Sequence, residues 1–147
     1  MKRITILIIA IASIHQFSIG QSDGKKGTIR IELHNLEHSN GLILLAMFDN
    51  ADAYPTKGDQ AILTKRYPIN SRPLVIELKD IAHGTYAISI VHDENGNGKL
   101  DANWIGIPNE GLGASNDAKG VMGPPSFEDA AFTLNFAIKK LDIHVSY

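Results

Sequence analysis

The sequence contains no cysteine among its 147 residues, and this absence excludes several kinds of chemistry. Without thiols the chain forms no disulfide, thiolate zinc site or iron–sulfur cluster, and it carries no lipid-modified cysteine. An excess of charge of one sign is also lacking. The formal net charge of −2 gives no basic surface for nucleic acid or an anionic membrane. The 44% hydrophobic content is that of a globular protein, and the length suits one domain.

Long hydrophobic runs are equally scarce, and the clearest one lies at the N-terminus. The basic residues Lys2 and Arg3 precede an apolar run from Ile4 to Ile14, and small residues precede Gln21. The run is shorter than the roughly 20 residues that cross a membrane, so a cleaved signal peptide is favoured over an anchor. We expect a signal peptide over residues 1–20 and one domain over residues 21–147. This mature chain would be exported to the periplasm, cell envelope or exterior, with no transmembrane span.

Apolar residues in the mature chain alternate with polar ones, which is the pattern of half-buried strands. The alternation is clear in residues 28–34, 74–79, 133–138 and 141–147, and Lys139–Lys140 is predicted to form the turn of a terminal hairpin. Leu42–Phe48 and Tyr86–Val91 are continuous apolar runs, typical of strands covered on both sides. Residues 61–69 are a weaker strand candidate.

This pattern predicts an all-β fold with little helix. Turn signals recur along the chain, so we expect six or seven antiparallel strands in a two-sheet sandwich of the transthyretin-like or immunoglobulin-like kind. Ile31, Ile88 and Phe136 are expected in its core. Residues 102–130 break the alternation and are rich in glycine and proline. We expect them to form one long loop, and loops of that length are usually functional or disordered.

The segment from Asp93 to Asp101 has the spacing of a calcium-binding loop. Oxygen-bearing side chains occupy its positions 1, 3, 5 and 9, which are Asp93, Asn95, Asn97 and Asp101. A glycine at position 6 permits the sharp turn, Lys99 at position 7 offers its backbone carbonyl, and Leu100 can anchor the loop to the core.

Position 12 of this loop departs from the calcium pattern, because Trp104 stands where a glutamate is expected. Glu110 or a water molecule is expected to complete the coordination, with modest affinity. The alternative is that the two Asn-Gly pairs only form tight turns. That alternative explains the glycines but not the alternating oxygen ligands, and magnesium suits the loop less well because it demands octahedral geometry.

Four segments of the chain carry specific motifs, namely residues 84–101, 106–111, 113–116 and 123–130. In these segments the sequence resembles a bacterial family of unknown function, DUF2141. The resemblance covers nearly the whole mature chain. It implies an exported envelope protein without an established activity, distantly similar to the transthyretin-like and collagen-adhesin B-type sandwiches. Some of those sandwiches carry similar calcium loops, usually with a later glutamate.

Other polar clusters have two interpretations each. His34 and His38 are a possible zinc pair. They straddle the end of a strand, however, so exposed polar residues are the simpler interpretation. Asp49, Asn50 and Asp52 are a possible second cation site or, more commonly, an acidic turn after a strand. His92 either orients Asp93 or faces a ligand in the loop, or it lies partly buried at the end of its strand.

Two functions therefore stay open. The favoured one is a non-enzymatic, calcium-stabilised module that binds an envelope component or small ligand, or acts as an accessory protein. The rival is a hydrolase with a site in the 102–130 loop, and its candidate residues are His92, Glu110, Ser115, Glu128 and Asp129. A hydrolase requires these groups to converge in a concave site, whereas a structural module requires only the metal loop.

The signal-peptide prediction is tested by the mass of the exported protein. Intact-mass spectrometry on protein recovered from the envelope fraction is expected to show a chain that begins within two residues of Gln21. A chain that keeps Met1 to Gly20 would contradict the cleavage.

Overall fold

The computed structural model describes residues 24–147, so the predicted signal peptide lies outside the described residues. The regular secondary structure of the described chain is almost entirely strand, as the alternation predicts. Its elements are β1 Lys26–His34, β2 Leu42–Phe48, β3 Leu63–Pro68, β4 Leu74–Ala82, β5 Gly84–Asp93, β6 Gly111–Ala114, β7 Phe132–Leu134 and β8 Ile138–His144, with single turns η1 Gly58–Gln60, η2 Ser115–Asp117 and α1 Phe127–Ala130. No helix within residues 24–147 has the length and apolar character to cross a membrane.

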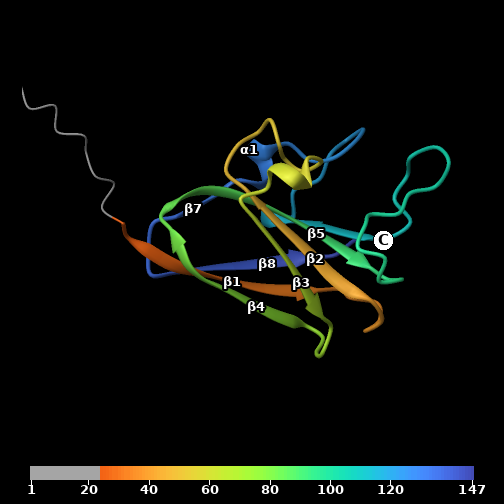
Figure 1. Ribbon diagram of the computed structural model, residues 1–147, viewed down its shortest axis with the longest axis horizontal. Coiled ribbons are helices and arrows are strands. Elements are labelled where there is room, and N and C mark those ends of the chain that lie inside the picture. The colour runs from red at the N-terminus through yellow and green to blue at the C-terminus, as the bar shows by residue number, and fades with distance from the viewer. Residues whose placement is uncertain (1–23) are drawn as a thin grey trace, which may run out of the picture.

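The strands form two sheets that pack face to face, so the all-β sandwich is confirmed (Figure 1). One sheet has the order β4-β1-β8, and the other has the order β3-β2-β5-β6 with β7 paired to β5. Strand pairs in the described chain are antiparallel except one. β1 and β8 run parallel, with Thr28 opposite Ile138 and His34 opposite His144.

The core lies between the sheets and is built from the alternate residues that the sequence pattern assigns to the inside. Ile31 and Ile88 are completely buried, which confirms both predictions. A second, smaller cluster covers the outer face of β2 and β5 and consists of Phe48, Ala53, Tyr54, Ala87 and Ala130. Part of β2 and β5 is therefore covered on both faces, which explains their continuous apolar sequences.

The predicted C-terminal hairpin is wrong. Lys139 and Lys140 lie inside β8, and β7 pairs with β5 in the other sheet. Between β7 and β8 the chain crosses from one sheet to the other over Gly27, where an added Cβ would lie 2.5 Å from the Phe136 carbonyl oxygen. Phe136 is consequently 72% exposed and not a core residue. Alternation predicts which residues face inward but not which neighbour a strand takes, and a crossover preserves the same inward face.

The expected 102–130 loop is also corrected, because this segment contains β6, η2 and α1. Its glycines serve close packing as well as turns. A Cβ at Gly111 would lie 2.6 Å from the Tyr147 ring, and one at Gly113 would lie 2.9 Å from Ile143. Because neither glycine has a side chain, β6 can approach β8 and the residues that follow it. Two shorter loops remain, residues 101–110 and 118–126.

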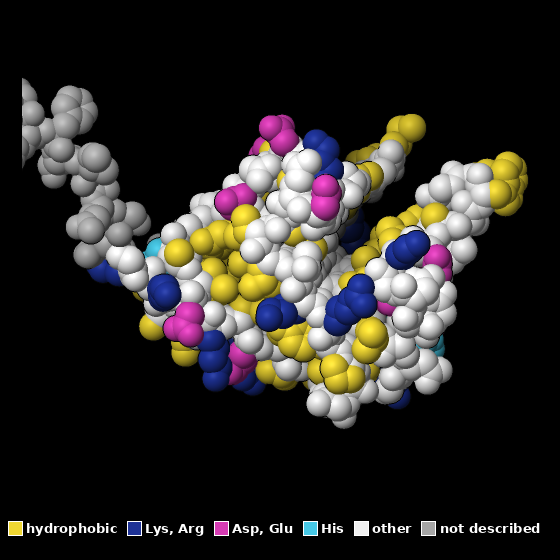
Figure 2. Space-filling model, viewed as in Figure 1, with side chains coloured by type: hydrophobic (Ala, Val, Ile, Leu, Met, Phe, Trp, Pro, Cys, Tyr) yellow, Lys and Arg dark blue, Asp and Glu magenta, His cyan; other side chains and the backbone are white. Residues whose placement is uncertain are grey.

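Both loops project from the same side of the molecule in the views of Figures 1 and 2, and each has a hydrophobic tip. Trp104 is 94% exposed on the first loop, and Val121 and Met122 are 100% and 99% exposed on the second. Exposed apolar side chains grouped in this way are typical of surfaces that contact another molecule.

The core assignment is tested by truncation at buried and exposed positions. Ile31→Ala and Ile88→Ala are expected to lower the free energy of unfolding by about 2–5 kcal/mol, since each leaves a cavity in the core. Phe136→Ala removes a larger but exposed side chain and is expected to change the stability by less than about 1 kcal/mol. Urea unfolding followed by circular dichroism measures all three. Equal losses at the three positions would contradict the assignment.

Candidate metal centre

The candidate loop begins where β5 ends, at a carboxylate that has no access to solvent. Asp93 is 0% exposed and pairs with Leu42 at the start of β2. Its two oxygens accept hydrogen bonds from the backbone N–H groups of Asn97, at 3.1 Å, and Gly98, at 2.7 Å. A buried carboxylate requires such donors or a cation, so the chain after β5 folds back around this group.

The side chains of three other predicted ligands lie close to one another. The side-chain amide nitrogens of Asn95 and Asn97 lie 2.6 and 2.7 Å from Oδ2 of Asp101. The amide oxygen of Asn95 accepts from the Asn97 N–H, and that of Asn97 accepts from the Lys99 N–H. The loop thus brings the Asn95 and Asn97 side chains to Asp101, whereas Asp93 meets the loop through the backbone N–H groups of Asn97 and Gly98. The Lys99 side chain is exposed.

Two glycines allow the loop to close. Gly96 and Gly98 have φ values of 72° and 81°, in the left-handed region where residues with a Cβ are strained. Gly98 also lies against a guanidinium, since a Cβ there would be 2.8 Å from a terminal nitrogen of Arg66. Leu100 is 45% exposed, so the prediction that it anchors the loop in the core is wrong.

Glu110 returns to the loop from the start of β6 and is only 6% exposed. One of its carboxylate oxygens accepts from the Glu94 N–H at 3.2 Å, and the other accepts from the Asp101 N–H at 3.0 Å. This single carboxylate therefore connects the beginning and the end of the loop. It also supplies negative charge beside Asp93 and Asp101, in the region where Trp104 offers none.

His92 is completely buried next to Asp93 and is held at both ring nitrogens. Nε2 lies 2.8 Å from the Asn40 carbonyl oxygen, and Nδ1 contacts the Tyr147 hydroxyl. Burial is the main cause that raises the pKa of Tyr147 above its usual value, so the hydroxyl stays protonated and can donate to Nδ1. This arrangement matches the buried strand-end interpretation of His92. It also joins the last residue of the chain to the strand that carries Asp93.

The candidate hydrolase residues have separate structural partners. Ser115 is completely buried, and its hydroxyl accepts from the Ile88 N–H at 2.9 Å and donates to the Ala130 carbonyl. His92 lies four residues further along β5 with its ring nitrogens engaged elsewhere. Asp129 pairs with Ser126, whose hydroxyl caps α1, and Glu110 accepts hydrogen bonds from the Glu94 and Asp101 N–H groups. Glu128, the fifth candidate, is exposed on α1.

The remaining candidate cation ligands have hydrogen-bond or ion-pair partners of their own. Asn50 accepts from the Ala53 N–H and donates to Asp49, which is the acidic-turn arrangement. His38 pairs with Glu94 at 2.9 Å, whereas His34 lies near Asp142 at 3.4 Å, so the two histidines belong to different groups. The grouping of His34 with Glu32 and Asp142 is absent from the sequence-based predictions.

Comparison with known proteins places the chain beside one family. The family described as "Uncharacterized protein conserved in bacteria (DUF2141)" matches residues 31–141, from β1 into β8 and across the whole candidate loop. No curated protein and no solved structure gives a significant match. The match confirms the resemblance seen in the sequence, and the description of the family names no reaction.

The clamp formed by Glu110 can be tested without any metal. Glu110→Gln replaces one carboxylate oxygen by an amide nitrogen that faces a backbone N–H group, so one hydrogen bond to a charged acceptor is lost. The free energy of unfolding is expected to fall by about 1.5–3 kcal/mol in chelator. Glu128→Gln, at an exposed position of α1, is the matched control and is expected to stay within about 0.5 kcal/mol. Equal effects in urea unfolding would exclude the clamp.

Proposed function

The chain belongs to the DUF2141 family, and we propose that it is an exported, non-enzymatic module that binds an envelope component and is stabilised by calcium in the Asp93–Asp101 loop. The observation that carries the proposal is that the loop folds back on the buried Asp93 carboxylate and directs the Asn95 and Asn97 side chains at Asp101. The clamp at Glu110 brings the two ends of the loop together.

Calcium suits this set of groups because it takes six to eight oxygen ligands in flexible geometry. Asp93 and Asp101 supply carboxylates, and Lys99 supplies a backbone carbonyl. Asn95 and Asn97 now direct their amide nitrogens at Asp101. Rotation of each amide by half a turn would direct its oxygen at the ion, and amide oxygens are ordinary calcium ligands. The rotation would also break the hydrogen bonds that the two amide oxygens now accept from the Asn97 and Lys99 N–H groups, so these N–H groups would have to turn to other acceptors or to water when the ion binds.

The same ion would position the loop that carries Trp104. Residues 101–110 project from the calcium loop, held at their base by hydrogen bonds between Asn109 and Asp101 and between Asn103 and Ile107. Trp104, Ile105 and Ile107 are more than half exposed on it. Large apolar side chains at a projecting tip are typical of a surface that contacts a partner. We therefore assign contact with the envelope component to this tip and to Val121–Met122 on the neighbouring loop.

Calcium is expected to raise the melting temperature, with a dissociation constant of about 10⁻⁵–10⁻³ M, the range of weak sensors and extracellular modules. At a concentration a hundredfold above that constant, the ion adds about 2.7 kcal/mol of stability if it binds only the folded state. Differential scanning calorimetry in calcium, magnesium and chelator measures the effect. Asp93→Asn and Asp101→Asn are expected to remove the increment, whereas Asp59→Asn, at an exposed carboxylate in η1, keeps it.

Trp104 provides a second readout because it is the sole tryptophan of the chain. Its fluorescence anisotropy is expected to rise when calcium stiffens the loop, and Asp101→Asn should prevent the rise. A melting curve and an anisotropy that millimolar calcium leaves unchanged would reject calcium binding, and the Asn-Gly pairs would then be turns alone.

A further inference from the structure

The outer face of the three-stranded sheet carries a second group of metal-ligating side chains, far in sequence from the calcium loop. In the parallel pair β1–β8, Glu32 is opposite Asp142 and His34 is opposite His144. All four alternate with buried neighbours and point away from the core. The parallel register therefore places two carboxylates at one level and two imidazoles at the next.

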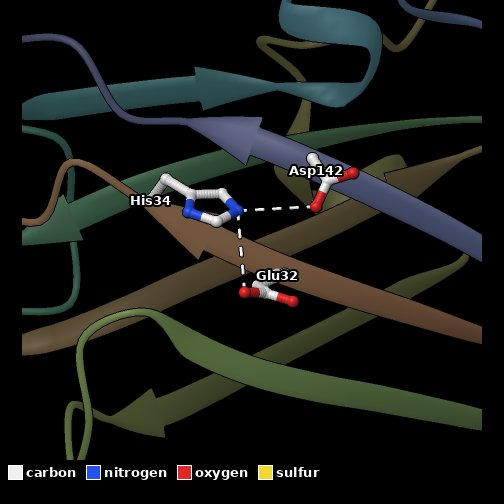
Figure 3. A group of neighbouring side chains, drawn as sticks. All are labelled: Glu32, His34 and Asp142. Atoms are coloured by element: carbon white, nitrogen blue, oxygen red, sulfur yellow. Dashed lines mark hydrogen bonds and ion pairs between the residues drawn. The ribbon is translucent and has the colours of Figure 1, made fainter.

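Three of these side chains converge on one point. Nε2 of His34 lies 3.4 Å from Oδ1 of Asp142 and 3.9 Å from Oε1 of Glu32, as Figure 3 shows. The three ligand atoms all lie within 4.8 Å of one another. Nitrogen and oxygen ligands bind zinc at about 2.0–2.2 Å in tetrahedral geometry, which sets neighbouring ligand atoms roughly 3.4 Å apart. The pair formed by His34 and Asp142 already has this spacing, and a small rotation of Glu32 would complete the triangle.

The electrostatics of the face favour a cation at this point. Glu32 and Asp142 are like charges directly opposite each other, an arrangement that destabilises a strand pair. Two basic residues, Arg30 and Lys140, lie one level away along the strands, and Arg30 is paired with Glu77 at 2.8 Å. A shallow depression of about 50 Å³ lies between Arg30, Lys140 and the two carboxylates. It offers room for an ion or a water molecule beside them.

The neighbouring imidazole is oriented in the way that is typical of zinc-binding histidines. His144 stacks on His34 with ring centroids 4.9 Å apart. Its Nδ1 lies 2.7 Å from Asp117, whose other carboxylate oxygen accepts the His144 backbone N–H. A proton held on Nδ1 leaves the lone pair on Nε2, and carboxylate–histidine pairs of this kind orient ligands in metal sites. Asp117 and Asn116 hold φ values of 51° and 60°, which are costly for residues other than glycine.

We propose that Glu32, His34 and Asp142 form a binding site for a divalent transition metal, with zinc as the probe ion and His144 as an adjacent imidazole that Asp117 orients. The mixture of imidazole and carboxylate ligands suits zinc, whereas calcium prefers a set made of oxygen alone. The side chains of Glu32 and His34 are 39% and 30% exposed, so water would occupy the remaining coordination positions. The site is independent of the calcium loop.

The test is calorimetric titration of the purified, untagged protein with zinc in the presence of saturating calcium. One zinc ion per chain is expected. His34→Gln and Asp142→Asn should abolish its binding, because each removes one of the three ligands. His83→Gln, at a histidine on the turn between β4 and β5, is the matched control and should leave zinc binding unchanged.

A second measurement locates the ion and guards against misfolded variants. Histidine-ring NMR signals are expected to shift on zinc addition for His34 and His144 but not for His83, and melting without zinc should be similar in wild type and Asp142→Asn. The proposal is overturned if the wild type binds no zinc, or if zinc binds equally well to His34→Gln. Neither outcome bears on calcium binding, because the calcium variants alter different residues.

Discussion

The need to satisfy a fully buried carboxylate at the end of β5 determines the shape of the surrounding loop. Asp93 lies in the sheet next to β2, out of reach of water, and its charge is tolerated only because backbone N–H groups of residues 97 and 98 turn back toward it. That turn requires a glycine at position 98 and brings Asn95, Asn97 and Asp101 together. The buried Glu110 carboxylate is satisfied in the same way, because it accepts hydrogen bonds from backbone N–H groups at both ends of the loop.

These contacts connect the loop to the rest of the fold. β5 pairs with β2, β6 and β7, so the segment that carries Asp93 is a central element of the larger sheet. Glu110 immediately precedes β6, and His92 is bonded to the final residue, Tyr147. The loop is therefore attached to β5 through Asp93 and to the start of β6 through Glu110, whereas the Trp104 side chain at the tip is exposed. A rigid base beneath an exposed apolar tip is the arrangement that the proposed function requires.

The inward faces of the strands could be predicted from the sequence because they depend on local alternation. Ile31 and Ile88 are buried as the period of two requires. Strand partners depend instead on where the chain crosses between sheets. The terminal hairpin was therefore predicted in place of the β1–β8 parallel pair, and Phe136 was assigned to the core. Gly111 and Gly113 could not be assigned from the sequence for a similar reason, because a glycine can indicate either a turn or a close approach between strands.

The two candidate sites differ for the same reason. The grouping from Asp93 to Asp101 follows from spacing within one short segment, and Glu110 could be suggested as a distant carboxylate. The grouping of Glu32 and His34 with Asp142 could not, because it joins residues more than a hundred positions apart through a parallel register. Each strand shows alternating polar residues, but only the pairing brings their side chains together. Sequence spacing detects sites within one segment, whereas sites between strands require the topology.

The central claim is that the Asp93–Asp101 loop holds calcium, and a crystal structure of the protein grown in calcium tests it most directly. We expect one ion with oxygen ligands from Asp93, Asn95, Asn97 and Asp101 and the Lys99 carbonyl, at about 2.3–2.6 Å. The Asn95 and Asn97 amides should be rotated relative to their present orientation. A loop that keeps both amide nitrogens on Asp101, with no ion among these oxygens at millimolar calcium, would contradict the account.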